Sequence, residues 1–326
     1  MESCTVYDGL PAASHLTLVD HHDPVDPAEG RIRKLSLSNT SKHSIRSRRL
    51  DRVATQLFWV LGALLLGLIL LMLIAIMKNG MFHLTLDFLV KPPEELDTGG
   101  GIGPILFNSF YVLGISLLLS LPIGIGAGIC LAEYAPRNKF TNTLRICVEG
   151  LASVPSIVFG LLGIAIFVEF FHIGLTILGG GATLALLNLP VLARVTEESI
   201  RATPQEYRDA SYALGATKFQ CLFTAVLPSA MPGIITGACL VAGRAFGESA
   251  VIILTAGLST SGNMWDFSLF APGETLAVHL WYIQSESIVS DAREIADKSA
   301  AVLVLVVLLI NFMFRLPIMM KNRKVK

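Results

Sequence analysis

The 326-residue sequence has little charge and lacks the motifs that build most soluble enzymes. Only 15% of its residues are charged, against about 25% in an ordinary soluble domain. Lys plus Arg and Asp plus Glu number 25 each, so no basic excess points to nucleic acid. The five cysteines form no CxxC pair, which argues against a zinc module and a disulfide framework. What has to be explained is the hydrophobic share, which is 53% of the chain.

Long uncharged runs account for this share, and the mean hydropathy is +0.63. A helix needs roughly 20 apolar residues to cross a hydrocarbon core about 30 Å thick. The sequence therefore predicts an all-α polytopic membrane protein with six transmembrane helices. We place them at residues 57–77, 102–132, 150–168 and 173–193, within 219–265, and at 299–314. Pro228 and Pro232 mark the front of the fifth window, and Gly257 lies behind it.

The positive charges lie mostly on one side of this predicted topology. Of the 25 Lys and Arg residues, 20 fall before the first span, in the second-to-third and fourth-to-fifth loops, or in the C-terminal tail. Short loops rich in Lys and Arg stay in the cytoplasm. Both termini are therefore predicted to be cytoplasmic, an N-in/C-in arrangement.

The N-terminal segment differs from the rest of the chain. Residues 1–50 are polar, contain several prolines and have no helical apolar period, so they predict a disordered cytoplasmic tail before a transmembrane domain at 51–326. His21, His22 and Asp23 are adjacent and have no further ligands at suitable spacing. No metal site is expected there.

The loop between the fourth and fifth spans carries a short amphipathic helix. Thr203-Pro204-Gln205-Glu206 has the pattern of a capping box with proline at the first helical position, so a helix is predicted to start at Thr203. Gly215 suits a left-handed C-cap, and a second segment is expected from about Thr217. The first helix has two faces. One face is formed by Tyr207, Ala210, Ser211 and Leu214. The opposite, charged face is formed by Glu206, Arg208 and Asp209. Physics alone leaves open an ordinary interfacial helix.

Two charges stand inside the fifth window. Arg244 and Glu248 are spaced i, i+4, so a continuous helix would place them on one face as an ion pair near mid-membrane. A charge inside the membrane is expensive and usually pairs or serves a pathway. An Arg there can offer a planar fork of donors to an oxyanion. The alternative is a structural pair that pins this helix to its neighbour.

Two further patterns concern packing rather than chemistry. Gly124, Gly126 and Gly128 lie in an apolar span and lack the strand and acidic residue of a nucleotide loop, so they predict close helix packing. The chain itself is not expected to bind ATP. Pro155 lies in the third span and is expected to bend it.

The run RDASYALGATKFQCLFTAVLP at 208–228 resembles the EAA loop of ABC-importer permease subunits. The match covers Asp209, Ala210, Gly215, Leu227 and Pro228. Asp209 stands where Glu is usual, and Ala225 stands where a branched aliphatic is expected. The resemblance implies a coupling helix that docks on a separate ATPase subunit. The residues that would form it are Glu206, Tyr207, Asp209, Ala210, Leu214 and Gly215.

A narrower resemblance extends over roughly half the chain, from about residue 99 to 257. SVPSIVFGLLG at 153–163, TLALLNLPVLARVTEESI at 183–200 and GRAFGESAVIILTAG at 243–257 are similar to the PstA-type permease of the phosphate-specific ABC importer. This resemblance implies a permease core at about residues 100–320, in the bacterial plasma membrane, with Arg244 and Glu248 on the substrate pathway. It gives this chain no catalytic residue and no bound cofactor. The implied partners are a PstC-like second permease, a PstB-like ATPase dimer that uses the ATP, and a PstS-like extracytoplasmic phosphate-binding protein.

Three alternatives stay open, and a fourth, an intramembrane enzyme, is disfavoured. The sister PstC-type permease shares much of the pattern, and a permease for sulfate or molybdate would carry the same kind of coupling loop. A secondary transporter would instead predict inverted repeats with broken helices, and no internal repeat is evident. An intramembrane enzyme would need a nucleophile with a base, or paired aspartates, within the spans.

Overall fold

The computed structural model describes residues 27–94, 99–136, 138–260, 263, 265–285 and 290–323, and every regular element in these ranges is helical. The chain divides into two units at Leu70–Leu71. The elements are α1 (Pro27–Met81), α2 (Leu86–Val90), α3 (Gly103–Ile129), η1 (Cys130–Tyr134), α4 (Lys139–Ala152), α5 (Ser156–Gly163), η2 (Ile164–Phe170), α6 (Ile177–Arg201), α7 (Gln205–Ala213), α8 (Lys218–Cys221), η3 (Leu222–Val226), α9 (Leu227–Phe246), α10 (Ala250–Thr255), α11 (Leu276–Ser285) and α12 (Ala292–Arg323).

Helix α1 begins at Pro27, so the backbone of residues 27–50 is helical where the sequence predicts disorder. No proline follows until Pro92, and a helix already nucleated by the apolar span extends at little cost. Residues 1–26, with His21–Asp23, lie outside the described residues, so the tail as a whole stays a prediction. All side chains from Asp51 to Leu70 are exposed, although most are apolar. Such a surface requires lipid around it.

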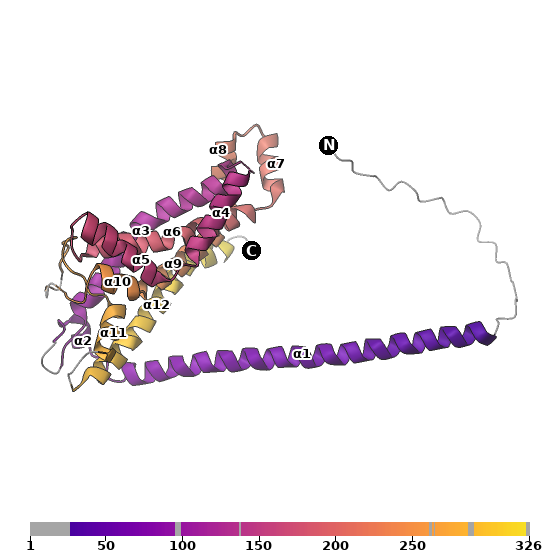
Figure 1. Cartoon of the computed structure of the whole chain (residues 1–326), viewed down its shortest axis with the longest axis horizontal. Coiled ribbons are helices and arrows are strands. Elements are labelled where there is room, and N and C mark those ends of the chain that lie inside the picture. Colours follow the sequence, from indigo (N-terminus) through magenta and orange to yellow (C-terminus); the bar gives the residue numbers. More distant parts are fainter. Residues whose placement is uncertain are drawn as a thin grey trace. The chain divides into compact units, whose positions relative to one another are not determined.

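Within the part of the chain that the structure describes, five helices are long and apolar enough to cross a membrane, and a bent pair makes a sixth if it counts as one span. Four of these segments, built on α3, α6, α9 and α12, belong to the 71–326 unit (Figure 1). Helix α6 packs against both α3 and α9, and α9 packs against α12. The all-helical membrane fold is therefore confirmed.

The third predicted span, 150–168, is not a straight helix. Helices α4 and α5 meet at an angle of 95° across Ser153–Pro155. The residue before a proline is pushed out of the helical region, so the first helix ends at Ala152, before Val154, and the second starts at Ser156 with Pro155 as its N-cap. The bend predicted at Pro155 is confirmed, but it is a break between two helices.

The fifth window is also divided differently from the prediction. Lys218–Phe246 is one helical run, and Pro228 and Pro232 are both accommodated within it. The π-helical turn η3 ends at Val226, two residues before Pro228, whose nitrogen has no hydrogen to donate. The run ends at Phe246. The short α10 ends at Thr255, and Gly257, two residues further on, has a φ of +93°.

Two of the three glycines in α3 fit against α6 as predicted. A Cβ on Gly124 would lie 2.7 Å from the Cβ of Leu192, and one on Gly128 would lie 2.5 Å from the Cβ of Thr196. A Cβ on Gly126 would meet no atom within 4 Å. Because residues at i and i+4 share one helix face, Gly124 and Gly128 form the contact while Gly126 points elsewhere.

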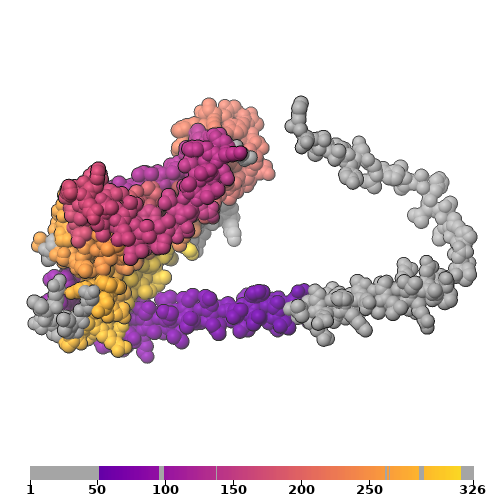
Figure 2. All heavy atoms as spheres, in the orientation of Figure 1, coloured from indigo at the N-terminus to yellow at the C-terminus, as the bar shows by residue number. Residues whose placement is uncertain are grey.

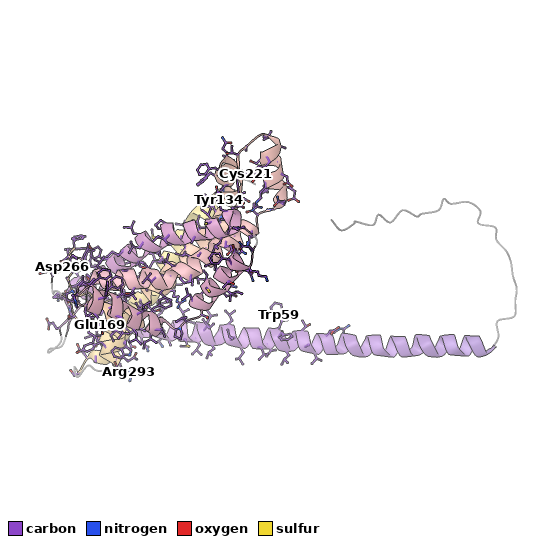
Figure 3. All side chains as sticks on the ribbon, turned by 45° about the horizontal axis from the view of Figure 1, so that its top comes forward. Trp59, Tyr134, Glu169, Cys221, Asp266 and Arg293 are labelled. Atoms are coloured by element: carbon purple, nitrogen blue, oxygen red, sulfur yellow. The ribbon has the colours of Figure 1, made fainter. Side chains whose placement is uncertain are left out.

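The two ends of the 71–326 unit carry different loops. Tyr134 and Cys221 lie at the end that bears α7 and α8, whereas Glu169, Asp266 and Arg293 lie at the opposite end (Figure 3). The predicted cytoplasmic loops thus meet at one end of the unit. The N-in/C-in orientation itself stays a prediction.

Candidate functional site

The first candidate site is the pair of short helices α7 and α8 between α6 and α9. Helix α7 starts at Gln205 with Pro204 as its N-cap, and no side chain caps it. The predicted capping box at Thr203 is therefore wrong. The N–H of Thr203 bonds to the carbonyl of Ile200, so this residue still belongs to the end of α6. Its side chain is buried, and the hydroxyl Oγ1 has no hydrogen-bond partner.

The turn between α7 and α8 agrees with the sequence. Gly215 has a φ of +81°, the left-handed conformation expected of a C-cap glycine. Helix α8 follows Thr217, whose Oγ1 accepts from the backbone of Gln220 while the Gln220 side chain accepts from the backbone N–H of Thr217. The capping box of this loop thus lies at α8 rather than at α7.

The outward surface of α7 and α8 carries apolar side chains that no described part of the chain covers. No residue of α7 is buried, and Leu214 at its C-cap is 89% exposed. Tyr207 is 51% exposed and Phe219 is 63% exposed. Figure 2 shows this segment projecting at one end of the 71–326 unit. An exposed apolar cluster of this kind marks a surface that contacts another molecule.

The inward face is held by Arg208. Its guanidinium donates to one carboxylate oxygen of Glu133, through Nε at 3.1 Å and Nη2 at 2.8 Å. It also donates to the backbone carbonyls of Thr203 and Ile200 at the end of α6. The Arg208 and Glu133 side chains are only 12% and 14% exposed. One side chain therefore connects α7 both to η1, which continues α3, and to α6.

Helix α8 is fixed to the same end of α3. The Lys218 ammonium donates to the carbonyl of Glu133 and lies 4.8 Å from the centre of the Tyr134 ring. Both short helices are therefore tied to one pair of neighbouring residues. A movement of α7 and α8 would be passed to α3, and through Arg208 to α6 as well.

A second ion-pair cluster lies beside the first. Glu197 on α6 accepts from Nε of Arg145 on α4 at 2.6 Å and pairs with Nη2 of Arg201 at 2.9 Å. Arg145 also donates to the carbonyl of Leu131. The Glu197 side chain is 10% exposed, and two guanidinium groups compensate its charge.

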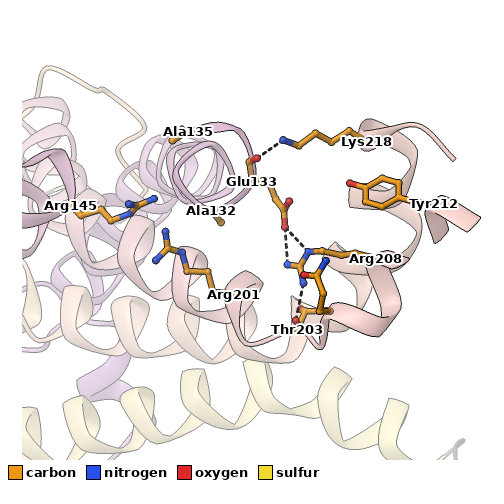
Figure 4. A pocket seen from close by; sticks show the side chains of 10 residues that line it. Ala132, Glu133, Ala135, Arg145, Arg201, Thr203, Arg208, Tyr212 and Lys218 are labelled. Atoms are coloured by element: carbon orange, nitrogen blue, oxygen red, sulfur yellow. Dashed lines mark hydrogen bonds and ion pairs between the residues drawn. The ribbon is translucent and has the colours of Figure 1, made fainter. Parts of the chain in front are cut away.

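These groups surround a hollow of about 760 Å³ (Figure 4). Its charged lining consists of four cations and one carboxylate, namely Arg145, Arg201, Arg208, Lys218 and Glu133. Thr203, Gln205 and Tyr212 add polar groups. Desolvation raises the pKa of the Tyr212 phenol, so this group is a donor at neutral pH.

The second candidate site, Arg244 and Glu248, differs from its predicted geometry. Helix α9 ends at Phe246, so the two residues do not share a helix face, and the described residues contain no ion pair between them. Arg244 stands in the last turn of a run that starts at Lys218, about 39 Å along the axis at 1.5 Å per residue. It thus lies at the end of the run remote from α8 rather than at the middle. The Arg244 side chain is exposed and Glu248 is partly buried.

Sequence reasoning missed the residues that position the loop. The sequence predicts Arg208 only as part of the charged face of α7, and it predicts no role for Glu133. A signal was present, since Glu133 and Glu149 are the acidic residues in an otherwise basic loop. Their partners come from distant parts of the chain, so spacing alone could not assign them.

The chain matches a known family over residues 120–322, described as the binding-protein-dependent transport system inner membrane component. It is 42% identical over 275 residues to a probable ABC transporter permease, YqgI of Bacillus subtilis, covering 81% of this chain and 94% of that protein. It is 31% identical over 244 residues to the phosphate transport system permease PstA of Haemophilus influenzae, covering 75% of this chain and 85% of that protein. A bacterial ABC transporter involved in alginate import has a similar fold, with a TM-score of 0.54, 16% identity, and coverage of 79% of this chain and 95% of that one.

Proposed function

The chain belongs to the binding-protein-dependent inner membrane components of ABC transporters, and from that premise we propose that it is the PstA-type permease subunit of an ATP-driven phosphate importer. The family implies a second permease, an ATPase and a substrate-binding protein as partners. Phosphate as the substrate is supported by relatives that are named phosphate permeases, including PstA of Haemophilus influenzae and PstA 2 of Mycobacterium bovis. The proposed partners are PstC-like, PstB-like and PstS-like proteins.

The observation that carries the coupling role is the two-sided α7. Its outward residues Tyr207 and Leu214 are apolar and exposed, and its inward Arg208 bonds to Glu133 and to the end of α6. A helix of this kind can bind an ATPase subunit on one side and transmit its position to two spans on the other. Glu206, Asp209, Ala210 and Gly215 complete the proposed coupling element.

The proposed mechanism is alternating access. ATP bound and hydrolysed by the partner subunits would change the distance between the two coupling elements of a permease pair. ATP would shift the equilibrium between the two conformations of each permease only if these conformations differ in their contacts with the ATPase. The free-energy difference between these contacts would limit the size of the shift. This chain would form half of the pathway and would carry out no chemistry itself.

We place Arg244 on this pathway, with Glu248 near it. Arg244 is exposed in the isolated chain and has no ion-pair partner among the described residues, so its guanidinium can compensate the charge of a passing oxyanion. Its place in the last turn of α9 puts it toward the outer mouth in the predicted orientation. The pathway surface would then be completed by the second permease.

The experiment that tests the substrate is competition in liposomes that hold this chain, the second permease, the ATPase and the binding protein. Uptake of labelled phosphate is measured with excess sulfate or molybdate. Phosphate uptake that neither anion reduces supports the proposal. Uptake that sulfate or molybdate competes away would assign the chain to a permease for that oxyanion.

A further inference from the structure

A basic hollow lies on the inner side of the coupling element and has no role in the mechanism above. It is enclosed by η1 and α4, by the end of α6, and by α7 and α8 (Figure 4). Its volume of about 760 Å³ is in the range of small-ligand sites. Tyr207 and Leu214, the exposed apolar residues used for the proposed ATPase contact, do not line it, so that surface and this hollow are distinct.

The charge balance of the hollow favours an anion. Four cationic side chains line it against the single carboxylate of Glu133, and Glu197 lies behind two of the arginines. Four of the five N–H donors of Arg208 are already used by Glu133 and the two backbone carbonyls. In the described part of the chain, Nη1 of Arg145 and Nε and Nη1 of Arg201 have no hydrogen-bond partner.

The hydroxyl of Thr203 is an independent observation. The residue is 6% exposed and lines the hollow, and its Oγ1 has no hydrogen-bond partner among the residues that the structure describes. Leaving a buried polar group without a partner is costly, so such groups usually face a ligand, an ion or water. The Tyr212 phenol, which is protonated at neutral pH, adds a second neutral donor to the same lining.

We propose that this hollow binds a phosphate-type oxyanion, either free phosphate or the phosphate of an anionic lipid headgroup. Arginine forks match phosphate oxygens, and Lys218 supplies a point charge from the opposite wall. The volume exceeds what a bare phosphate ion fills, which leaves room for an organic group attached to it. Basic pockets at the cytoplasmic ends of membrane helices bind lipid headgroups by this chemistry. The bound anion would connect α4 and α6 to α8.

The test uses the full-length chain in nanodiscs of phosphatidylcholine, with or without phosphatidylglycerol. Saturable binding of labelled inorganic phosphate is measured in the neutral discs, and retained phosphatidylglycerol is measured by native mass spectrometry in the mixed ones. Arg201→Gln is the main variant. Arg194→Gln is the matched control, because Arg194 lies on the same helix, is similarly exposed and paired, and does not line the hollow.

We expect Arg201→Gln to weaken binding about tenfold or more and Arg194→Gln to leave it unchanged. Thr203→Val gives a second test, since it removes only an unpartnered hydroxyl and should weaken binding without lowering thermal stability. Loss of phosphate binding identifies the free ion as the ligand, whereas loss of retained phosphatidylglycerol identifies the lipid headgroup.

Three results would overturn the proposal. The first is the absence of both phosphate binding and lipid retention. The second is binding that Arg201→Gln leaves intact and Arg244→Gln abolishes, because the anion would then occupy the transport pathway. The third is binding that disappears when the ATPase is added, because a group of the ATPase would then fill the hollow. None of these measurements requires transport. A failure of this proposal can therefore be distinguished from a failure of the proposed transport function.

Discussion

Among single side chains, Arg208 does most to define the coupling element. Its four hydrogen bonds join α7 to the carboxylate of Glu133 and to the last carbonyls of α6. Carbonyls at a helix C-terminus have no partner within the helix, so an arginine from the next element both satisfies them and opposes the helix dipole. The contact is nearly buried, which makes it stronger than the exposed ion pairs nearby.

Glu133→Gln should separate coupling from hydrolysis. The variant keeps the shape of the side chain but leaves Arg208 without a nearly buried counter-charge, at a cost of up to about 3 kcal/mol. We expect less phosphate transported per ATP hydrolysed in proteoliposomes. Glu149→Gln is the control, because Glu149 is 61% exposed and pairs with Arg194, whose side chain is 44% exposed. Equal effects of both variants would show that the Arg208 contact carries no special role.

Arg244→Gln should abolish phosphate uptake while the transporter still assembles. Its guanidinium is exposed at the end of α9 and is not needed for an ion pair among the described residues. Uptake is measured in proteoliposomes, and assembly is measured by co-purification of the partner subunits. Failure of the variant to assemble would favour a structural role for Arg244.

At the scale of elements, the turn between α7 and α8 depends on one glycine. A Cβ on Gly215 would meet no atom within 4 Å, so space does not exclude a side chain. The constraint is the φ of +81°, which costs an L-residue roughly 1–2 kcal/mol. Gly215→Ala should therefore weaken binding of the ATPase subunit, measured by co-purification, without a steric clash. Gly215→Asn should restore part of the binding, because Asn tolerates this conformation. Unchanged binding in Gly215→Ala would contradict a defined turn.

The glycines of α3 offer a matched pair for packing against α6. Gly128→Ala would place a Cβ 2.5 Å from Thr196 and 2.6 Å from the carbonyl of Ala193, and should destabilise the protein by about 1–3 kcal/mol. Gly126→Ala meets open space and should stabilise it by up to about 1 kcal/mol. Thermal unfolding in detergent compares the two. A lower melting temperature for Gly126→Ala than for Gly128→Ala would contradict the α3–α6 contact.

The same elements show what the sequence could and could not predict. Long apolar runs predicted the helices, Gly215 predicted the turn, and Pro155 predicted the bend, because each effect is local. The sequence could not predict that Pro228 would lie within a continuous helical run next to the π-helical turn η3. It also could not predict that α9 would end at Phe246. Both depend on the packing of α9 against α6 and α12. For the same reason, the prediction that Arg244 and Glu248 share a helix face was wrong, and the contact between Glu133 and Arg208 was not predicted.

At the scale of the whole molecule, the chain is one subunit of a larger transporter complex. Its exposed α7 face and its membrane charges have few partners within the described residues, as expected of surfaces that other subunits cover. Membership of the family implies those other subunits, namely an ATPase, a second permease and a binding protein. A transporter built this way must lose all uptake when the ATPase is withheld, whereas a secondary transporter would not.

The measurement that tests this account most directly is phosphate uptake in liposomes with and without the ATPase subunit, at a fixed ATP concentration. We predict ATP-dependent uptake with the complete set of subunits and none when the ATPase is absent or when Leu214→Asp disrupts the exposed coupling face. Uptake that continues without the ATPase would contradict the coupling role of α7 and α8 and would identify a secondary transporter.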